Sequence, residues 1–256
     1  MTTPTPDRPL VFAAPAYANS VPLTHCIPDV CPGARVVLDY PSRLIEPLRR
    51  SEFAAGLIPV AALFAEPEFV AIPGIGICAE KRVCSVLLRC RRPLAEIRTV
   101  ELDSASRTSN ALTRVLFQKH WCRPVRFVTA PTTTPADAAV VIGDRALCEP
   151  PGPAGDLDLA EQWHHLTGLP FVFAVWVHRR NHPKAVELAR CVQAAKAAGV
   201  SLIPELARQQ AEKLGLSLEL CLDYFATCIY YDAGLREVQG LELFRQSVRE
   251  LEAASV

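Results

Sequence analysis

The stretch at residues 161–180, EQWHHLTGLPFVFAVWVHRR, constrains the fold more than any other part of the chain. It begins as a polar helix end, turns at Gly168 and Pro170, and continues as a nearly uninterrupted apolar run over residues 169–177. An apolar strand without alternation is typical of a strand that is covered on both faces. We therefore expect this strand to lie deep in a sheet or between two packed bodies, with a structural role.

Length and charge exclude several classes of protein. The 256 residues can form one large domain or two smaller ones. Lys plus Arg and Asp plus Glu each number 27, so the formal net charge is zero. A neutral chain argues against a nucleic-acid surface or a polybasic membrane patch, and no apolar run is long enough to span a bilayer. We expect neither a nucleic-acid nor a membrane partner, and the oligomeric state stays open.

The cysteines and the N-terminus predict a cytoplasmic protein. The ten cysteines form no C-x-x-C pair and no Cys/His cluster at zinc spacing, so we interpret them as small buried hydrophobes in a reducing compartment, without a metal. The Ala-Pro-Ala at residues 14–16 mimics a signal cleavage site. However, the apolar run before it is short and follows Asp7 and three prolines, which favours a first strand.

The first part of the chain alternates strands and helices. Strands are predicted at residues 10–14, 35–40 and 54–64, the last running into a short helix, and Ser42 is a suitable N-cap for a helix at 43–51. This order predicts parallel strands with right-handed crossovers, and ligands bind beyond the carboxyl ends of such strands. The polar loop at residues 15–20 would lie at that edge.

A second α/β unit follows, between two apolar strands predicted at residues 82–90 and 169–177. Its segment AAVVIGDRAL (138–147) matches AAGLIPVAAL (54–63) in the first unit, which favours a two-lobe pseudo-repeat. A helix at 155–167 would be capped by Asp156 or Asp158, and the chain after residue 183 is helical. We expect one lobe from residues 1–90 and 178–256, a second from 91–177, and two hinge strands near 83–90 and 169–177 that cross between them.

The candidate site residues are mostly neutral hydrogen-bond donors, which together with free helix N-terminal N–H groups suit a carboxylate ligand. The run SASRTSN could equally be only a helix cap, and Arg107 could pair with a second carboxylate or be solvated. Asp144 lies at a predicted cleft edge but could instead be a helix N-cap. The six histidines form no convincing base or metal set. The candidates are Tyr17, Asn19, Ser42, Ser85, Ser106, Arg107, Thr108, Ser109, Gly143 and Asp144.

Several segments together resemble one family. APAYANSVPL, PSRL, EFAAGLIPVAAL, CSVLLRC, SRTSNAL, VVIGDRAL and above all DLAEQWHHLTGLPFVFAVWVHR are similar to the chorismate dehydratases of the futalosine route to menaquinone. The related 1,4-dihydroxy-6-naphthoate synthases share the fold. The resemblance covers about residues 10–190. It implies an α/β, two-lobe fold like that of type II periplasmic binding proteins, with two crossing strands and C-terminal helices.

The resemblance also implies the reaction: dehydration of chorismate, a dicarboxylate, to 3-[(1-carboxyvinyl)oxy]benzoate, by a carbon–oxygen lyase that needs no cofactor. By position, Asn19 and Ser85 would form the catalytic pair, with Thr108 and Ser109 holding a carboxylate. Two alternatives remain: a naphthoate synthase-like lyase, whose site uses a histidine base, and a solute-binding protein that only captures a small anion.

Overall fold

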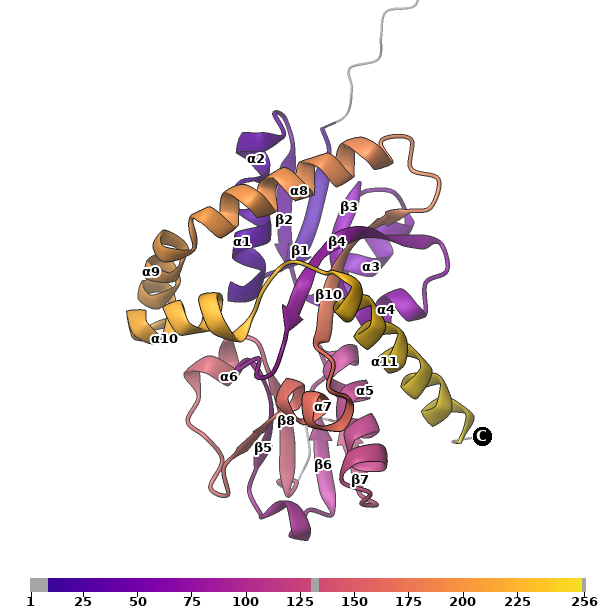
Figure 1. The fold of residues 1–256 in the computed structure, drawn as a ribbon, viewed down its shortest axis with the longest axis vertical. Helices are drawn as coiled ribbons and strands as arrows, with labels where there is room; N and C mark the ends of the chain where they lie inside the picture. Colours follow the sequence, from indigo (N-terminus) through magenta and orange to yellow (C-terminus); the bar gives the residue numbers. More distant parts are fainter. Residues whose placement is uncertain (1–8, 130–133, 255–256) are drawn as a thin grey trace, which may run out of the picture.

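Two α/β lobes make up the protein, one above the other (Figure 1). The structure is a computed structural model that describes residues 9–129 and 134–254. The first lobe contains a five-stranded sheet in the order β2-β1-β3-β10-β4. Its strands are β1 (Val11–Pro15), β2 (Arg35–Asp39), β3 (Ala55–Pro59), β4 (Phe69–Ala79) and β10 (Phe171–Arg179). The predicted strands near 10–14, 35–40 and 54–59 are confirmed, and β1 pairs in parallel with both β2 and β3.

The second lobe repeats this plan. Its five-stranded sheet has the order β7-β6-β8-β5-β9, in which β6 pairs in parallel with β7 and β8. Its strands are β5 (Val86–Cys90), β6 (Thr99–Leu102), β7 (Arg126–Thr129), β8 (Ala138–Ile142) and β9 (Asp156–Asp158). The two-lobe fold class is therefore confirmed.

Helices surround both sheets, and the long C-terminal ones extend beyond the first lobe (Figure 1). The α-helices are α1 (Val21–Thr24), α2 (Ile27–Val30), α3 (Pro41–Arg49), α4 (Val60–Phe64), α5 (Arg107–Val115), α6 (Asp144–Cys148), α7 (Leu159–Thr167), α8 (Ala185–Ser201), α9 (Ile203–Leu214), α10 (Leu218–Asp223) and α11 (Leu235–Ala253). Short 3-10 or π segments are η1 (Ala18–Ser20), η2 (Leu94–Glu96), η3 (Leu116–His120) and η4 (Tyr224–Cys228). In the described residues no helix has the length and apolar character needed to cross a membrane.

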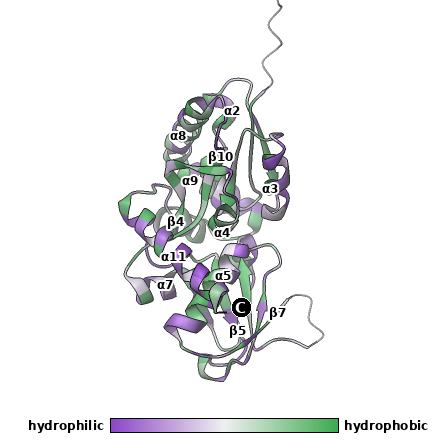
Figure 2. Cartoon of the chain, turned by 90° about the vertical axis from the view of Figure 1, so that its right-hand side faces the viewer, coloured by the Kyte–Doolittle hydropathy of each residue, from purple (hydrophilic) through white to green (hydrophobic). Residues whose placement is uncertain are grey.

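The apolar strand singled out in the sequence is β10, and its residues 171–178 are all buried. Trp176 packs edge-on against Phe12 at 5.9 Å between ring centroids, and Phe171 packs against both Trp163 and Phe244. Figure 2 shows hydrophobic residues along the strands of both lobes, with hydrophilic turns on α3 and α11. The prediction that this strand is covered on both faces is confirmed.

Strand β4 is absent from the sequence prediction. Pro73, Gly74 and Gly76 are typical of turns, yet they lie within an eleven-residue strand that pairs antiparallel with β10. Gly76 suits this close pairing because a Cβ there would lie 2.8 Å from the Ala174 carbonyl oxygen. The central position of β10 thus depends on a neighbour without local strand signals.

The chain passes between the lobes twice. β5 lies wholly in the second sheet and β10 wholly in the first. We therefore propose that the crossings are the segments just before these strands, residues 80–85 and 168–170, and that the lobe boundaries follow from them.

Helix α11 adds a third connection between the lobes. It packs on β10 and α4 in the first lobe and on α5 in the second. Near its C-terminal end, Ser247 Oγ and Glu250 Oε2 accept hydrogen bonds from Lys119 Nζ of η3 at 3.1 and 2.5 Å. The C-terminal helix therefore holds both lobes.

Candidate functional site

A small cavity lies where the lobes meet. Its lining comes from the carboxyl ends of parallel strands in both sheets, as the strand order predicts, and from β4 and β10. About 60 Å³ of space remains in it. The lining residues are Pro15, Tyr17, Asn19, Pro41, Pro59, Ile77, Val83, Val86, Ala105, Ser106, Thr108, Ser109, Ile142, Gly143, Phe173 and Ala174.

The first lobe contributes Tyr17 and Asn19. Tyr17 precedes η1 and its ring lies against Gly143 of the second lobe, where a Cβ would be only 2.9 Å from Tyr17 Cδ1. Burial, together with the charges of Asp103 and Asp144, raises the pKa of Tyr17 to about 12. The phenol is therefore a neutral donor at physiological pH.

The second lobe contributes the N-terminus of α5. Ser106 is its N-cap, and its Oγ accepts a hydrogen bond from the Ser109 backbone N–H at 3.2 Å. The Ser106 and Ser109 hydroxyls also lie 2.7 Å apart. Thr108 Oγ1 accepts a hydrogen bond from the Ala61 N–H of the first lobe at 3.1 Å. The SASRTSN run is thus a helix cap that also faces the cavity.

Asp144 connects the lobes at a second point. The N-cap of α6 is Gly143, and the Asp144 carboxylate instead accepts a hydrogen bond from the Ala18 N–H at 2.9 Å. Burial raises the pKa of this carboxyl group above its usual value. The N-cap alternative for Asp144 is therefore wrong.

Ser85 lies just before β5, is fully buried and does not itself line the cavity. Its Oγ accepts a hydrogen bond from the hydroxyl of Tyr224, a buried residue of η4, at 2.9 Å. The same hydroxyl is hydrogen-bonded to the Asn19 side chain, which lines the cavity. Tyr224 is missing from the sequence-based site because it lies in an apolar helical stripe typical of core packing.

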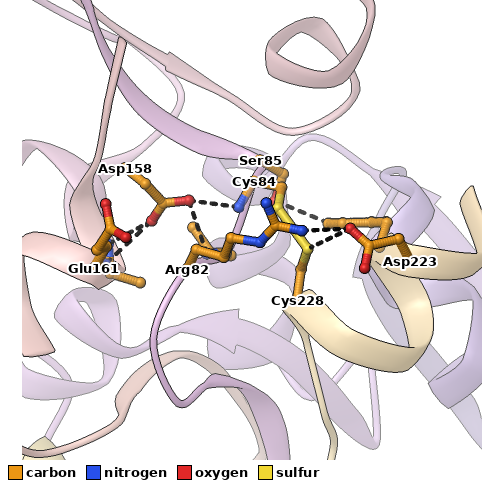
Figure 3. The surroundings of a disulfide bond; sticks show 10 residues. Arg82, Cys84, Ser85, Asp158, Glu161, Asp223 and Cys228 are labelled. Carbon is orange, nitrogen blue, oxygen red and sulfur yellow. Dashed lines mark hydrogen bonds and ion pairs between the residues drawn. A yellow bond between two sulfur atoms is a disulfide. The ribbon is translucent and has the colours of Figure 1, made fainter. Parts of the chain in front are cut away.

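The segment before Ser85 is held from both sides (Figure 3). Asp158 Oδ2 accepts hydrogen bonds from the Val83 and Cys84 N–H groups at 2.9 and 2.7 Å, while its Oδ1 caps α7 through the N–H groups of Ala160 and Glu161. Burial raises the pKa of Asp158 to about 6. This carboxylate therefore fixes the backbone next to Ser85.

On the other side, Cys84 forms a disulfide with Cys228 of η4 (Figure 3). The expectation that the cysteines are all reduced is wrong for these two. They are 144 residues apart, so no spacing motif marks them, and the fold brings their Cα atoms within 6.3 Å. The disulfide joins the segment of Ser85 to the segment of Tyr224.

Besides Ser85 and Asp144, two further sequence candidates do not line the cavity. Ser42 is exposed in the first turn of α3, whose N-cap is Tyr40, so the predicted cap is wrong; Pro41 lines the cavity instead. Arg107 is exposed and lines a separate, more open cavity of about 980 Å³ together with Arg114 and Phe127. That cavity is larger, but the carboxyl ends of the parallel strands converge on the smaller one.

The comparisons with known proteins give both a family and a fold. The model of a protein family described as menaquinone biosynthesis matches residues 10–250. A chorismate dehydratase from Thermus thermophilus is 28% identical over 262 residues, 94% of this chain and 96% of that protein. A chorismate dehydratase from Campylobacter jejuni is 41% identical over 101 residues, 39% of this chain and 34% of that protein.

Solved structures agree on the fold. A protein from Archaeoglobus fulgidus superposes with a TM-score of 0.72 at 14% identity, covering 98% of this chain and 99% of that one. The periplasmic aliphatic sulphonate binding protein of Escherichia coli superposes with a TM-score of 0.64 at 15% identity, covering 97% and 93%. The fold is thus that of the periplasmic binding proteins.

Proposed function

Because the chain belongs to this menaquinone-biosynthesis family, we propose that it dehydrates chorismate to 3-[(1-carboxyvinyl)oxy]benzoate. The observation that supports this most is the grouping of neutral donors around one cleft: Asn19 from one lobe, and Ser106, Thr108 and Ser109 at a helix N-terminus of the other. Such a lining suits a dicarboxylate. The proposal includes the futalosine route and a cytoplasmic location; recovery of the protein in a periplasmic fraction would contradict the location.

The reaction needs a proton acceptor that this lining does not provide. Asn19 and Ser85 are neutral and cannot act as strong bases. We propose that the enolpyruvyl carboxylate of the substrate removes the ring C3 proton itself. The electron pair is delocalised toward the ring carboxylate, and the C4–O bond then breaks as the protonated enolpyruvyl carboxyl group returns the proton to the leaving hydroxyl. Water is released, the enolpyruvyl carboxylate is regenerated and the ring becomes aromatic.

In this scheme the protein orients the substrate and stabilises developing negative charge. Asn19 and Ser85 orient the enolpyruvyl carboxylate, which requires the Ser85 hydroxyl, buried behind the lining of the closed cavity, to become accessible when the lobes separate. The N-terminus of α5 with Thr108 and Ser109 holds the ring carboxylate. Tyr17 and Asp144 lie at the same edge, and Phe173 and Ala174 of β10 form an apolar wall. Ser42 and Arg107 have no part in it.

The lobes must separate to admit substrate. The remaining space of about 60 Å³ is well below the roughly 300 Å³ at which ligand sites begin. Opening would break the Thr108–Ala61 and Asp144–Ala18 hydrogen bonds. Closure over the substrate would then exclude water from the reacting carbons.

Turnover of chorismate tests the proposal directly. The protein is incubated with chorismate, and the product is followed by ultraviolet absorbance and by its mass, which is lower by one water. Asn19→Ala and Ser85→Ala should each lower turnover by about 100-fold or more. Rates within about twofold of wild type in both variants would exclude this pair. Binding without turnover would instead indicate a solute-binding protein.

The naphthoate synthase alternative is less well supported. That reaction would require a histidine in the cleft, and none of the residues that line the cavity in the described part of the chain is a histidine.

A further inference from the structure

One buried hydroxyl joins the two residues proposed to act on the substrate. Tyr224 contributes it from the C-terminal part of the chain, and its side chain is 2% exposed. It donates to Ser85 Oγ across 2.9 Å and is also hydrogen-bonded to the Asn19 side chain. Neither Tyr224 nor Ser85 lines the cavity, so both lie behind Asn19, which does.

The contacts around Asn19 indicate how its amide is oriented. The Asn19 carbonyl oxygen accepts a hydrogen bond from the Ser20 hydroxyl at 3.3 Å, which leaves the Asn19 NH2 group to donate to the phenol oxygen of Tyr224. The Tyr224 hydroxyl in turn donates to Ser85 Oγ. Ser85 Oγ, as the acceptor, keeps its own proton to donate. Tyr224 thus sets the orientation of both donor groups.

Two covalent or ionic ties surround this contact (Figure 3). Asp223, next to Tyr224, pairs with Arg82 at 2.5 Å, and Cys228 at the end of η4 is bonded to Cys84. Both partners belong to the crossing segment that leads into Ser85. The fold therefore anchors η4 to this segment on both sides of Tyr224.

We infer that Tyr224 is a positioning residue for the proposed dehydration, holding Ser85 and Asn19 in the orientation in which they meet the substrate. This inference rests on the proposed function. It assigns the C-terminal helices a direct connection to the reaction in addition to their packing role.

Tyr224→Phe tests the inference because it removes only the hydroxyl. Tyr231→Phe is the matched control, since Tyr231 lies shortly after η4 and is also buried, and its hydroxyl has no hydrogen-bond partner in the described structure. We expect Tyr224→Phe to lower kcat by about tenfold or more with KM within about twofold, and Tyr231→Phe to leave both within about twofold.

A double-mutant cycle separates positioning from a general loss of structure. In a Ser85→Ala background, Tyr224→Phe should lower kcat by a smaller factor than it does in the wild type, because one of the two partners of the Tyr224 hydroxyl is already gone. Independent, multiplying effects would overturn the inference, as would a kcat loss that only follows the folded fraction measured by circular dichroism. Wild-type protein without turnover would overturn the proposed function itself, whereas an active wild type with an equally active Tyr224→Phe would overturn only the role of Tyr224.

Discussion

The Asp144 carboxylate and the Ala18 N–H meet across the boundary between the lobes at 2.9 Å. Asp144 begins a helix of the second lobe, and Ala18 begins the 3-10 turn that carries Asn19 in the first. The hydrogen bond between Thr108 and Ala61 joins the lobes at another helix start. When the cleft is closed, the Ala18 N–H and the Thr108 hydroxyl, which could bind a substrate carboxylate, are therefore hydrogen-bonded within the protein instead.

Asp144→Ala should favour the open form of the free protein. Losing one hydrogen bond of about 1 kcal/mol shifts the ratio of open to closed molecules by about fivefold. Small-angle X-ray scattering should show a larger radius of gyration, and Asp144→Ala with Thr108→Val a larger one still. Ser201→Ala is the control, because that hydroxyl bonds only within its own helix, to the Ala198 carbonyl. An unchanged radius in the double variant would contradict the prediction.

Gly143→Ala should impair both stability and turnover. Gly143 has a φ of +62°, and an added Cβ would lie 2.9 Å from the Tyr17 ring across the cleft. Gly155→Ala is a control for the backbone alone: its φ is +86° but nothing lies within 4 Å of the new Cβ. We expect both variants to lose about 1–3 kcal/mol in denaturant unfolding. Only Gly143→Ala should lower kcat/KM by more than about tenfold; equal activity losses would argue against the contact with Tyr17.

Reduction of the Cys84–Cys228 disulfide should lower the melting temperature. Cross-linking residues 144 positions apart restricts the unfolded chain by up to about 5 kcal/mol in the chain-entropy model. The Cys228→Ser variant should have the lower melting temperature of the reduced wild type without any reductant, and adding reductant should not change that temperature. Cys122→Ser, which removes an exposed free cysteine, should respond as the wild type does. A wild-type protein that is insensitive to reductant would be the contrary result.

Asp158 should make stability fall as pH rises. Its pKa is raised from 3.8 to about 6 in the folded protein because burial outweighs the four N–H donors. Protonation of Asp158 therefore stabilises the folded state fully below about pH 4, and this stabilisation is lost as the pH rises through about 6. The unfolding free energy of wild type minus that of Asp158→Asn should therefore decrease by about 3 kcal/mol between pH 4 and pH 7. A difference that increases with pH would mean that the hydrogen bonds dominate.

The strands and the cleft could be predicted from the sequence because their signals are local. The unbroken apolar run of β10 and the hydroxyl-rich start of α5 each carry their own pattern, and the strand order places the cleft at the carboxyl ends. The family resemblance added the reaction, and the roles of Asn19 and Ser85 stay predictions.

The features that the sequence did not predict depend on contacts between segments that are far apart in the chain. β4 contains Pro73 and two glycines and becomes a strand only through pairing with β10. Tyr224 looks like a core residue because its partner Ser85 is 139 positions away. The Cys84–Cys228 disulfide likewise joins residues that are far apart in the sequence. No local pattern encodes such contacts, so a single sequence cannot reveal them.

Helix α11 sets a limit on how far the cleft can open. It packs on β10 and α4 of the first lobe and on α5 of the second, and Lys119 of the second lobe donates to Ser247 and Glu250 near its C-terminal end. A rotation of the second lobe away from the first therefore has to break the packing between α5 and α11 and detach Lys119. The C-terminal helix thus acts as a strut that restrains the opening of the cleft.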